Sequence, residues 1–319
     1  MTHDHDPAVT PGNRRMFPHA ARTFRCAGAL AAAALALLPL AALSACGPAP
    51  RAAPVRSQAT SATHASVLIS ASSIAKIPEP DVAAELRLAR LGPRDPALGA
   101  RAVRYGIVAY RVRYRTVNAV GLPTSASGLV AFPADGPRQL QVVDYGHGTT
   151  AFKPGVPSSF GLDASRDGLE GRWSAELFAS AGFAVAEPDY PGLGAGPGRP
   201  EYMVAKSETT ASLDLLRATQ QIARSRGDKL APGVLVTGFS EGGSAAMAAG
   251  RALQHGVVPA FRLRALAPVS GPYDLAGAQL PGIFNGQVAA GVAPYYVAYT
   301  LTAWNPLYHL YAARSEEHT

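Results

Sequence analysis

The stretch Val234-Leu235-Val236-Thr237-Gly238-Phe239-Ser240-Glu241-Gly242-Gly243 decides the fold. It begins with an apolar run typical of a buried strand, and an alanine-rich helix is predicted over 241–255 directly after it. Gly-x-Ser-x-Gly between a strand and a helix is the pattern of a nucleophile elbow, a tight turn that lifts the serine hydroxyl above a sheet. The two outer glycines leave room for strand and helix to approach closely. Ser240 is therefore the predicted nucleophile, on a helix tip whose free N–H groups favour negative charge.

Strands and helices alternate on both sides of this turn. Two alternating stretches, 105–115 and 126–132, predict an antiparallel hairpin at the edge of a sheet. Shorter apolar runs are typical of parallel strands buried on both faces, with helices as the connections between them. These strands are predicted at 141–145, 183–188, 234–237 and 266–269, and the helices at 173–181, 209–226 and 241–255. The order predicts an α/β domain with a doubly wound, mostly parallel sheet.

A second motif, Tyr145-Gly146-His147-Gly148-Thr149-Thr150, directly follows the strand at 141–145. Acyl transfer needs two N–H donors aimed at the developing oxyanion. One comes from the residue after the nucleophile, here Glu241, and the other from a loop after an earlier strand. We predict Thr149 as the second donor, with Gly148 and Thr150 as alternatives. His147 is interpreted as a structural loop histidine rather than a catalytic base.

A third motif, Asp189-Tyr190-Pro191-Gly192-Leu193-Gly194, follows the strand at 183–188. Its glycines lack the G-x-G-x-x-G spacing of a dinucleotide-binding loop, and the prolines at 191, 197 and 200 prevent a helix from starting there. We predict a crossover loop that lines the pocket, with Asp189 in local hydrogen bonds and without a catalytic role.

The first residues read as a targeting signal. Arg22 and Arg25 precede an apolar run over 27–43, which is too short to span a bilayer comfortably. Leu43-Ser44-Ala45-Cys46 then resembles the bacterial lipobox, which implies lipidation of Cys46 and a protein exported to the cell envelope or periplasm on a membrane anchor. An ordinary cleaved signal is the alternative, and a weak twin-arginine pattern at 13–17 leaves the export route open.

Composition and length set the remaining limits. The 319 residues are 48% apolar, enough for a sizeable core, and residues 47–75 are rich in Ala, Ser, Thr and Pro. We predict a signal peptide at 1–46, a flexible linker at 47–75 and one domain at 76–313. The net charge of +7 is scattered, so no nucleic-acid partner is expected. The two cysteines, Cys26 and Cys46, both lie in the leader, which excludes a disulfide, a cysteine nucleophile and a thiolate metal site in the domain.

Together these motifs resemble the α/β-hydrolase superfamily and, within it, the secretory lipases, over about residues 100–313. The residues that carry the resemblance are Tyr114-Arg115-Thr116, Gly128-Leu129-Val130, Tyr145 to Thr149, Asp189 to Gly194 and Gly238 to Gly243. The resemblance implies hydrolysis of carboxylic esters or acylglycerols through an acyl-enzyme on Ser240, without metal or organic cofactor. It also implies a helical lid, here at about 272–313, for which a plain core helix is the alternative.

The chain departs from this family pattern after the nucleophile. The superfamily order is serine, acid, then histidine. No candidate strand follows Val269, and the acids and histidines beyond Ser240 lie on the elbow helix, at the lid or in the last residues: Glu241, Asp274, Glu316, Glu317, His255, His309 and His318. We therefore predict that the triad acid and base and the C-terminal strands are missing, that 314–319 is an artefactual tail, and that the chain as written is almost inactive.

Two other functions stay open at this point. One is a serine peptidase of the prolyl-oligopeptidase type, which shares the elbow and the triad order but needs a large additional domain. The other is a non-catalytic surface lipoprotein that uses a hydrolase scaffold for binding.

Overall fold

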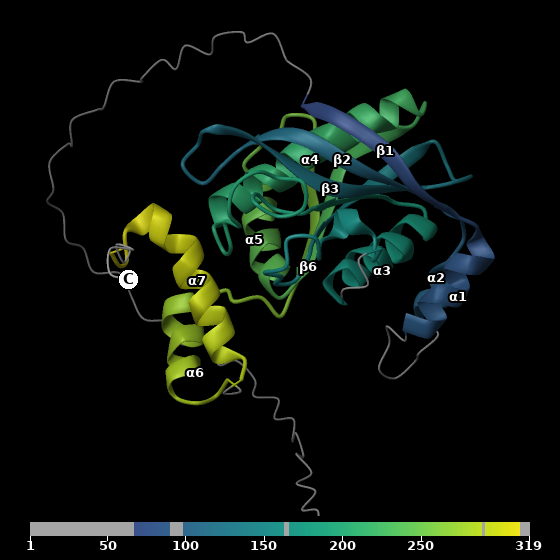
Figure 1. Ribbon diagram of the computed structural model, residues 1–319. Coiled ribbons are helices and arrows are strands. Elements are labelled where there is room, and N and C mark those ends of the chain that lie inside the picture. Colours follow the sequence, from purple (N-terminus) through teal and green to yellow (C-terminus); the bar gives the residue numbers. More distant parts are fainter. Residues whose placement is uncertain (1–66, 90–97, 163–165, 289–290, 313–319) are drawn as a thin grey trace, which may run out of the picture. The chain divides into compact units, whose positions relative to one another are not determined.

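A computed structural model of the chain describes residues 67–89, 98–162, 166–288 and 291–312 (Figure 1). All of them lie in one compact unit, Thr60–Thr319. The predicted signal peptide, the lipidation site Cys46, the tail at 314–319 and most of the predicted linker lie outside the described residues. Among the helices that the structure describes, none is long and apolar enough to cross a membrane.

The described residues form one seven-stranded sheet in the order β1-β2-β3-β5-β4-β6-β7. Its strands are β1 (Leu68–Ile77), β2 (Ile107–Val117), β3 (Pro123–Pro133), β4 (Gln139–Gly146), β5 (Ala184–Pro188), β6 (Lys229–Phe239) and β7 (Arg262–Val269). The pairs β1–β2, β2–β3 and β3–β5 are antiparallel, whereas β5, β4, β6 and β7 run parallel. The predicted hairpin and the parallel half are confirmed, but the hairpin is not at the edge of the sheet, because β1 pairs with its outer side. The sheet as a whole is mixed.

Helices cover both faces of this sheet. They are α1 (Glu79–Ala89), α2 (Leu98–Ala102), α3 (Arg166–Ser180), α4 (Ala205–Ser225), α5 (Glu241–Gln254), α6 (Leu280–Phe284) and α7 (Ala293–Tyr308), with short turns η1 (Pro157–Ser159) and η2 (Leu275–Gln279). One core cluster joins α4 and α5 to the sheet and the other joins α1 and α3. Figure 1 shows α3 and α4 on opposite sides of the sheet, which is the doubly wound arrangement.

Strand β3 shows why the chain folds this way. Its consecutive residues alternate between the two clusters, with Val130 and Phe132 packed toward α4 and Leu129 and Ala131 packed toward α3. All four side chains are buried. A strand that is apolar on both faces needs a helix layer on each side, and the sequence supplies those layers before and after it.

The N-terminal boundary differs from the prediction. Residues 68–75, assigned to the flexible linker, belong to β1, which pairs with β2 along the edge of the sheet. Most side chains of β1 are exposed or half-buried, and the edge strand contacts only one neighbouring strand. Serine and alanine are therefore tolerated in it, and a Ser-Ala-rich edge strand has the same composition as a linker.

Candidate active site

Ser240 occupies a strained turn between β6 and α5. Its backbone has φ 56° and ψ −119°, in a region that residues with a Cβ rarely adopt. Its N–H donates to the carbonyl of Val269 at the end of β7 (3.0 Å), which holds the turn against the neighbouring strand. Because such strain persists only where the surroundings impose it, it marks a candidate functional position.

Two glycines make this turn possible. A Cβ on Gly238 would lie 2.3 Å from the carbonyl oxygen of Gly242, and a Cβ on Gly242 would lie 1.9 Å from the carbonyl oxygen of Gly146. The start of α5 therefore packs directly on the ends of β6 and β4. Any side chain at these positions would push the serine out of place, which is the physical basis of the Gly-x-Ser-x-Gly spacing.

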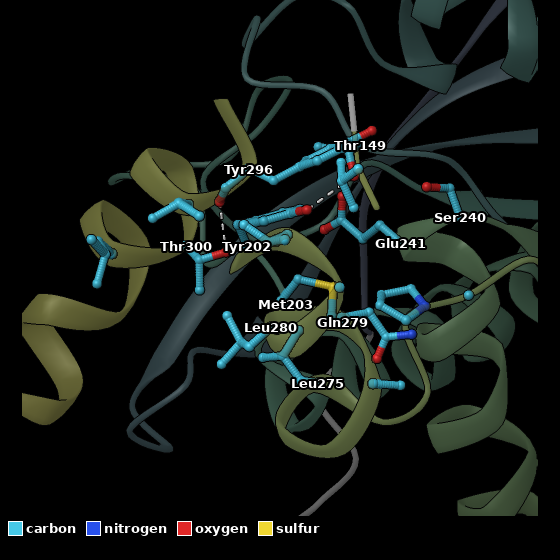
Figure 2. A pocket seen from close by; sticks show the side chains of 18 of the residues that line it. Thr149, Tyr202, Met203, Ser240, Glu241, Leu275, Gln279, Leu280, Tyr296 and Thr300 are labelled. Atoms are coloured by element: carbon cyan, nitrogen blue, oxygen red, sulfur yellow. Dashed lines mark hydrogen bonds between the residues drawn. The ribbon is translucent and has the colours of Figure 1, made fainter. Parts of the chain in front are cut away.

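Ser240 lines a cavity of about 570 Å³ (Figure 2). Its hydroxyl is turned toward the side where Glu241 and Thr149 lie. The opposite wall comes from η2, α6 and α7 and is mostly apolar, with contributions from Leu275, Leu280, Ile283, Val297, Leu301 and Trp304. The Ser240 hydroxyl makes no hydrogen bond with any residue that the structure describes. The cavity can thus hold an apolar group next to a free hydroxyl.

The loop after β4 reaches the same cavity. The Gly148 N–H donates to Glu170 Oε1 (3.0 Å), which also accepts from the Tyr145 hydroxyl (2.9 Å). The Gly148 amide is therefore engaged elsewhere in this conformation. Thr149 lines the cavity beside Ser240, and its Oγ1 lies 3.2 Å from the Tyr202 hydroxyl.

Helix α7 docks on this loop through aromatic side chains. The Tyr299 hydroxyl donates to the carbonyl of Thr150 (2.9 Å), and the Tyr299 ring stacks on Tyr202 with centroids 4.2 Å apart. The Trp304 indole N–H donates to the carbonyl of Tyr202 (3.1 Å). Residues 293–308 are thereby joined to the segments that carry Thr149 and Tyr202.

His147 is buried beside the site and takes part in loop structure. Its Nδ1 lies 2.7 Å from the Gly148 carbonyl, its Nε2 lies 3.4 Å from the Asp189 carbonyl, and its ring stacks on Tyr190. It is not among the residues that line the cavity. The interpretation of His147 as a structural loop histidine agrees with these contacts.

Asp189 makes the local hydrogen bonds expected of it. Its carboxylate accepts from the Ser127 hydroxyl (2.5 Å) and from the Ser158 N–H (2.9 Å), and burial raises its pKa. The following residue, Tyr190, has a positive φ of 63°. Asp189 thus joins the loop after β5 to β3 and η1, and it contributes no group to the cavity.

The sequence reasoning missed a pair of buried carboxyl groups under the nucleophile turn. The side chains of Glu241 and Glu208 interact with each other and have exposed fractions of only 3% and 2%. Burial raises the pKa of Glu208 to about 8 and that of Glu241 well above its usual range. The only sequence signal was a glutamate next to the nucleophile, and its partner is 33 positions away on α4. In the described ranges no group of His, Cys, Asp and Glu side chains could hold a metal ion.

A serine with positive φ at the head of a helix, directly after a parallel strand of a mixed sheet, is the arrangement of the α/β-hydrolase fold. Two solved structures share it: lpg1103 of Legionella pneumophila (TM-score 0.66, 24% identity, 76% of this chain and 62% of that one) and the rice cell wall degrading esterase LipA from Xanthomonas oryzae (TM-score 0.63, 24% identity, 76% and 61%). The chain therefore spans about three fifths of the length of these proteins.

Residues 174–301 match the model of the Secretory lipase family. This match runs from α3 into α7 and includes the nucleophile turn, so the resemblance to the secretory lipases within the α/β-hydrolase superfamily is confirmed. No curated protein matches the chain in sequence.

Proposed function

We propose that the protein is a serine hydrolase that cleaves carboxylic esters or acylglycerols through an acyl-enzyme on Ser240. The observation that carries this proposal is the strained turn at Ser240, which presents a free hydroxyl to an apolar cavity. The match to the Secretory lipase family supports the ester class of substrate.

The proposed reaction follows from the groups around the hydroxyl. The Ser240 oxygen attacks the ester carbonyl while a base takes its proton, and the tetrahedral oxyanion collapses with loss of the protonated alcohol. Water then attacks the acyl-enzyme and releases the acid. The N–H groups of Glu241 and Thr149 are the proposed oxyanion donors, because the Gly148 amide is held by Glu170. The start of α5 adds the positive end of a helix dipole.

The proposed substrate also follows from the cavity. The wall formed by η2, α6 and α7 is mostly apolar and is suited to an acyl chain, although Gln279, Tyr296 and Thr300 also line it. We propose that the segment at about 272–313 acts as the lid.

For the N-terminus we keep the proposal of a signal peptide with a lipidated Cys46, which would place the enzyme in the cell envelope or periplasm. Export is consistent with the family match.

Labelling with a fluorophosphonate probe tests the proposal directly, because the probe reacts only with an activated serine. We expect labelling of the given chain to be slow, because no described histidine contacts Ser240, and we expect Ser240→Ala to lose the label. Ser225→Ala is the matched control, since Ser225 is exposed at the end of α4 and bonds only to the carbonyl of Ile222. Equal labelling of Ser240→Ala and the wild type would refute the proposal.

A second candidate function rests on one observation. Ser240 has no histidine partner among the described residues, so the scaffold could bind an apolar ligand without reacting with it. Absence of labelling in the wild type, together with binding of a fluorescent fatty acid in the cavity, would favour this non-catalytic lipoprotein.

A further inference from the structure

Neighbouring amides of the loop after β4 are bonded differently. The backbone N–H groups of Thr149 and Glu241 have no acceptor within the described part of the chain, and both residues line the cavity beside Ser240. The N–H of Gly148, one residue earlier, donates to the Glu170 carboxylate instead. The contacts around Gly148 therefore decide which amide of this loop is left free for an oxyanion.

The peptide unit between Gly148 and Thr149 is held at its carbonyl. The Gly148 carbonyl oxygen lies 2.7 Å from His147 Nδ1, and because a carbonyl only accepts, the proton of this hydrogen bond is on Nδ1. The peptide bond is trans and planar, so its C=O and N–H groups point in opposite directions. The bond to the buried imidazole therefore also sets the direction of the Thr149 N–H, on the side away from His147.

Glu170 holds the other side of Gly148. One carboxylate oxygen, Oε1, accepts from the Gly148 N–H (3.0 Å) and from the Tyr145 hydroxyl (2.9 Å). The second oxygen lies 3.1 Å from the place that a Cβ on Gly148 would take, so a side chain there would push the carboxylate away. A hydrogen bond to a carboxylate is about twice as strong as one between neutral groups. Both polar groups of Gly148 are therefore engaged, which restrains the peptide that follows.

Helix α3 gives this carboxylate a fixed origin. Gly171, the residue after Glu170, packs so closely on η1 that a Cβ there would lie 2.5 Å from the Cα of Pro157. Further along the helix, Ala175 and Ala179 belong to the core cluster on this face of the sheet. The backbone that carries the carboxylate is thus tightly packed at the same point, and the two donors then fix the carboxylate itself over the loop after β4.

We propose that Glu170 is a positioning residue for the oxyanion: it holds the Gly148 N–H away from the cavity and so keeps the Thr149 N–H in place as the second donor. This role rests on the proposed function, whereas the hydrogen bonds that it requires do not. Glu170 is not among the residues that line the cavity, so it acts through the loop and touches no substrate. Without Glu170, the Gly148 N–H loses its acceptor and the peptide can rotate, which misplaces the Thr149 N–H.

The first experiment uses NMR on the chain with isotopically labelled glycine and needs no catalytic activity. The Gly148 signal is identified as the one that Gly148→Ala removes. In the wild type its amide proton should exchange slowly with solvent, because it is hydrogen-bonded. Glu170→Ala should make this exchange at least about tenfold faster, since hydrogen bonds to charged groups are among the stronger ones. Glu170→Gln should keep the exchange slow, because its amide oxygen still accepts.

Gln221→Ala is the matched control for both experiments. The Gln221 Oε1 accepts from the backbone N–H of Leu68, also at 3.0 Å, so the substitution removes a side-chain acceptor of the same kind from a backbone amide. Neither residue lines the cavity. The control should therefore leave the Gly148 signal and the reactivity of Ser240 as they are in the wild type.

The second experiment measures the rate of fluorophosphonate labelling of Ser240 relative to the wild type, at equal folded fractions. Losing one oxyanion donor costs about 10²–10³ in rate, so Glu170→Ala, which displaces a donor without deleting it, should be labelled at least about tenfold more slowly. Glu170→Gln should stay within about threefold of the wild type, because its amide oxygen accepts both hydrogen bonds. A glutamate that only stabilises the fold would give the wild-type rate in all variants.

The outcomes separate this inference from the proposed function. A wild type that is not labelled at all rejects the serine hydrolase, and the exchange of the Gly148 amide still decides whether Glu170 fixes the loop. A labelled wild type in which that amide exchanges rapidly rejects the inference alone. Labelling of Glu170→Ala at the wild-type rate rejects the positioning role. Should Glu170→Ala not fold, Glu170→Met keeps an apolar side chain of similar length and must show the same two losses.

Discussion

The substitution Gly242→Ala tests the close contact on which the nucleophile turn depends. A Cβ at this position would lie 1.9 Å from the Gly146 carbonyl oxygen, whereas real Cβ contacts are almost never under 3.0 Å. Helix α5 and strand β4 would have to separate by at least 1.1 Å, the difference between those two distances. Overpacking of this kind costs about 1–3 kcal/mol or more. Alanine regains up to about 1 kcal/mol of helix propensity, so a net loss of up to about 2 kcal/mol is expected.

Gly250→Ala on the same helix is the matched control. Its Cβ would meet only the Leu266 side chain, at 3.0 Å from Cδ1, and that side chain can move. The same gain in helix propensity applies, so the stability should change by less than about 1 kcal/mol. Urea unfolding followed by the fluorescence of Trp173 and Trp304 measures both variants. Equal unfolding midpoints for Gly242→Ala and the wild type would show that backbone proximity does not constrain the turn.

Three further predictions concern helix α7, a buried acid and turnover. Tyr299→Phe removes the hydrogen bond to the Thr150 carbonyl, so the free energy of unfolding, measured with urea, should fall by about 1 kcal/mol. Labelling of Ser240 by the fluorophosphonate probe should also become slower. Burial raises the pKa of Asp144 to about 7, so the folded state binds a proton that the unfolded state releases near pH 4. Stability should therefore fall as pH rises from about 4 to 7, by up to about 4 kcal/mol, and Asp144→Asn should flatten this part of the unfolding curve. Turnover of p-nitrophenyl esters by the chain as given should be slow, because no described histidine contacts Ser240; rapid turnover that Ser240→Ala abolishes would overturn this and direct attention to Asp274 with His309.

The nucleophile turn was predictable because its physics is local. Gly238 and Gly242 are required by contacts within a few residues of Ser240 and with the end of β4. The parallel strands could also be predicted from their apolar runs, because a strand that is buried on both faces consists almost entirely of apolar residues. Strand β1 could not be predicted in this way, because an exposed edge strand can have the same amino-acid composition as a linker.

The carboxyl pair could not be predicted for a different reason. A glutamate in a sequence is expected at the surface, and burial of Glu208 depends on how α4 packs against α5. That packing brings together residues from two helices that are separated by the whole of β6. The contact between Thr149 and Tyr202 is of the same kind, because its partners come from loops after different strands.

Backbone strain around the cavity connects these observations. Met203, Ser240 and Ser270 all line the cavity, and all have positive φ. Each such residue costs about 1–3 kcal/mol, so each needs a contact from elsewhere in the fold that enforces it. For Ser240 that contact is the hydrogen bond to β7 and the packing of two glycines. For Met203 one such contact is the hydrogen bond that its Sδ accepts from the Ser244 hydroxyl (3.7 Å), which joins this wall of the cavity to the helix that follows the nucleophile.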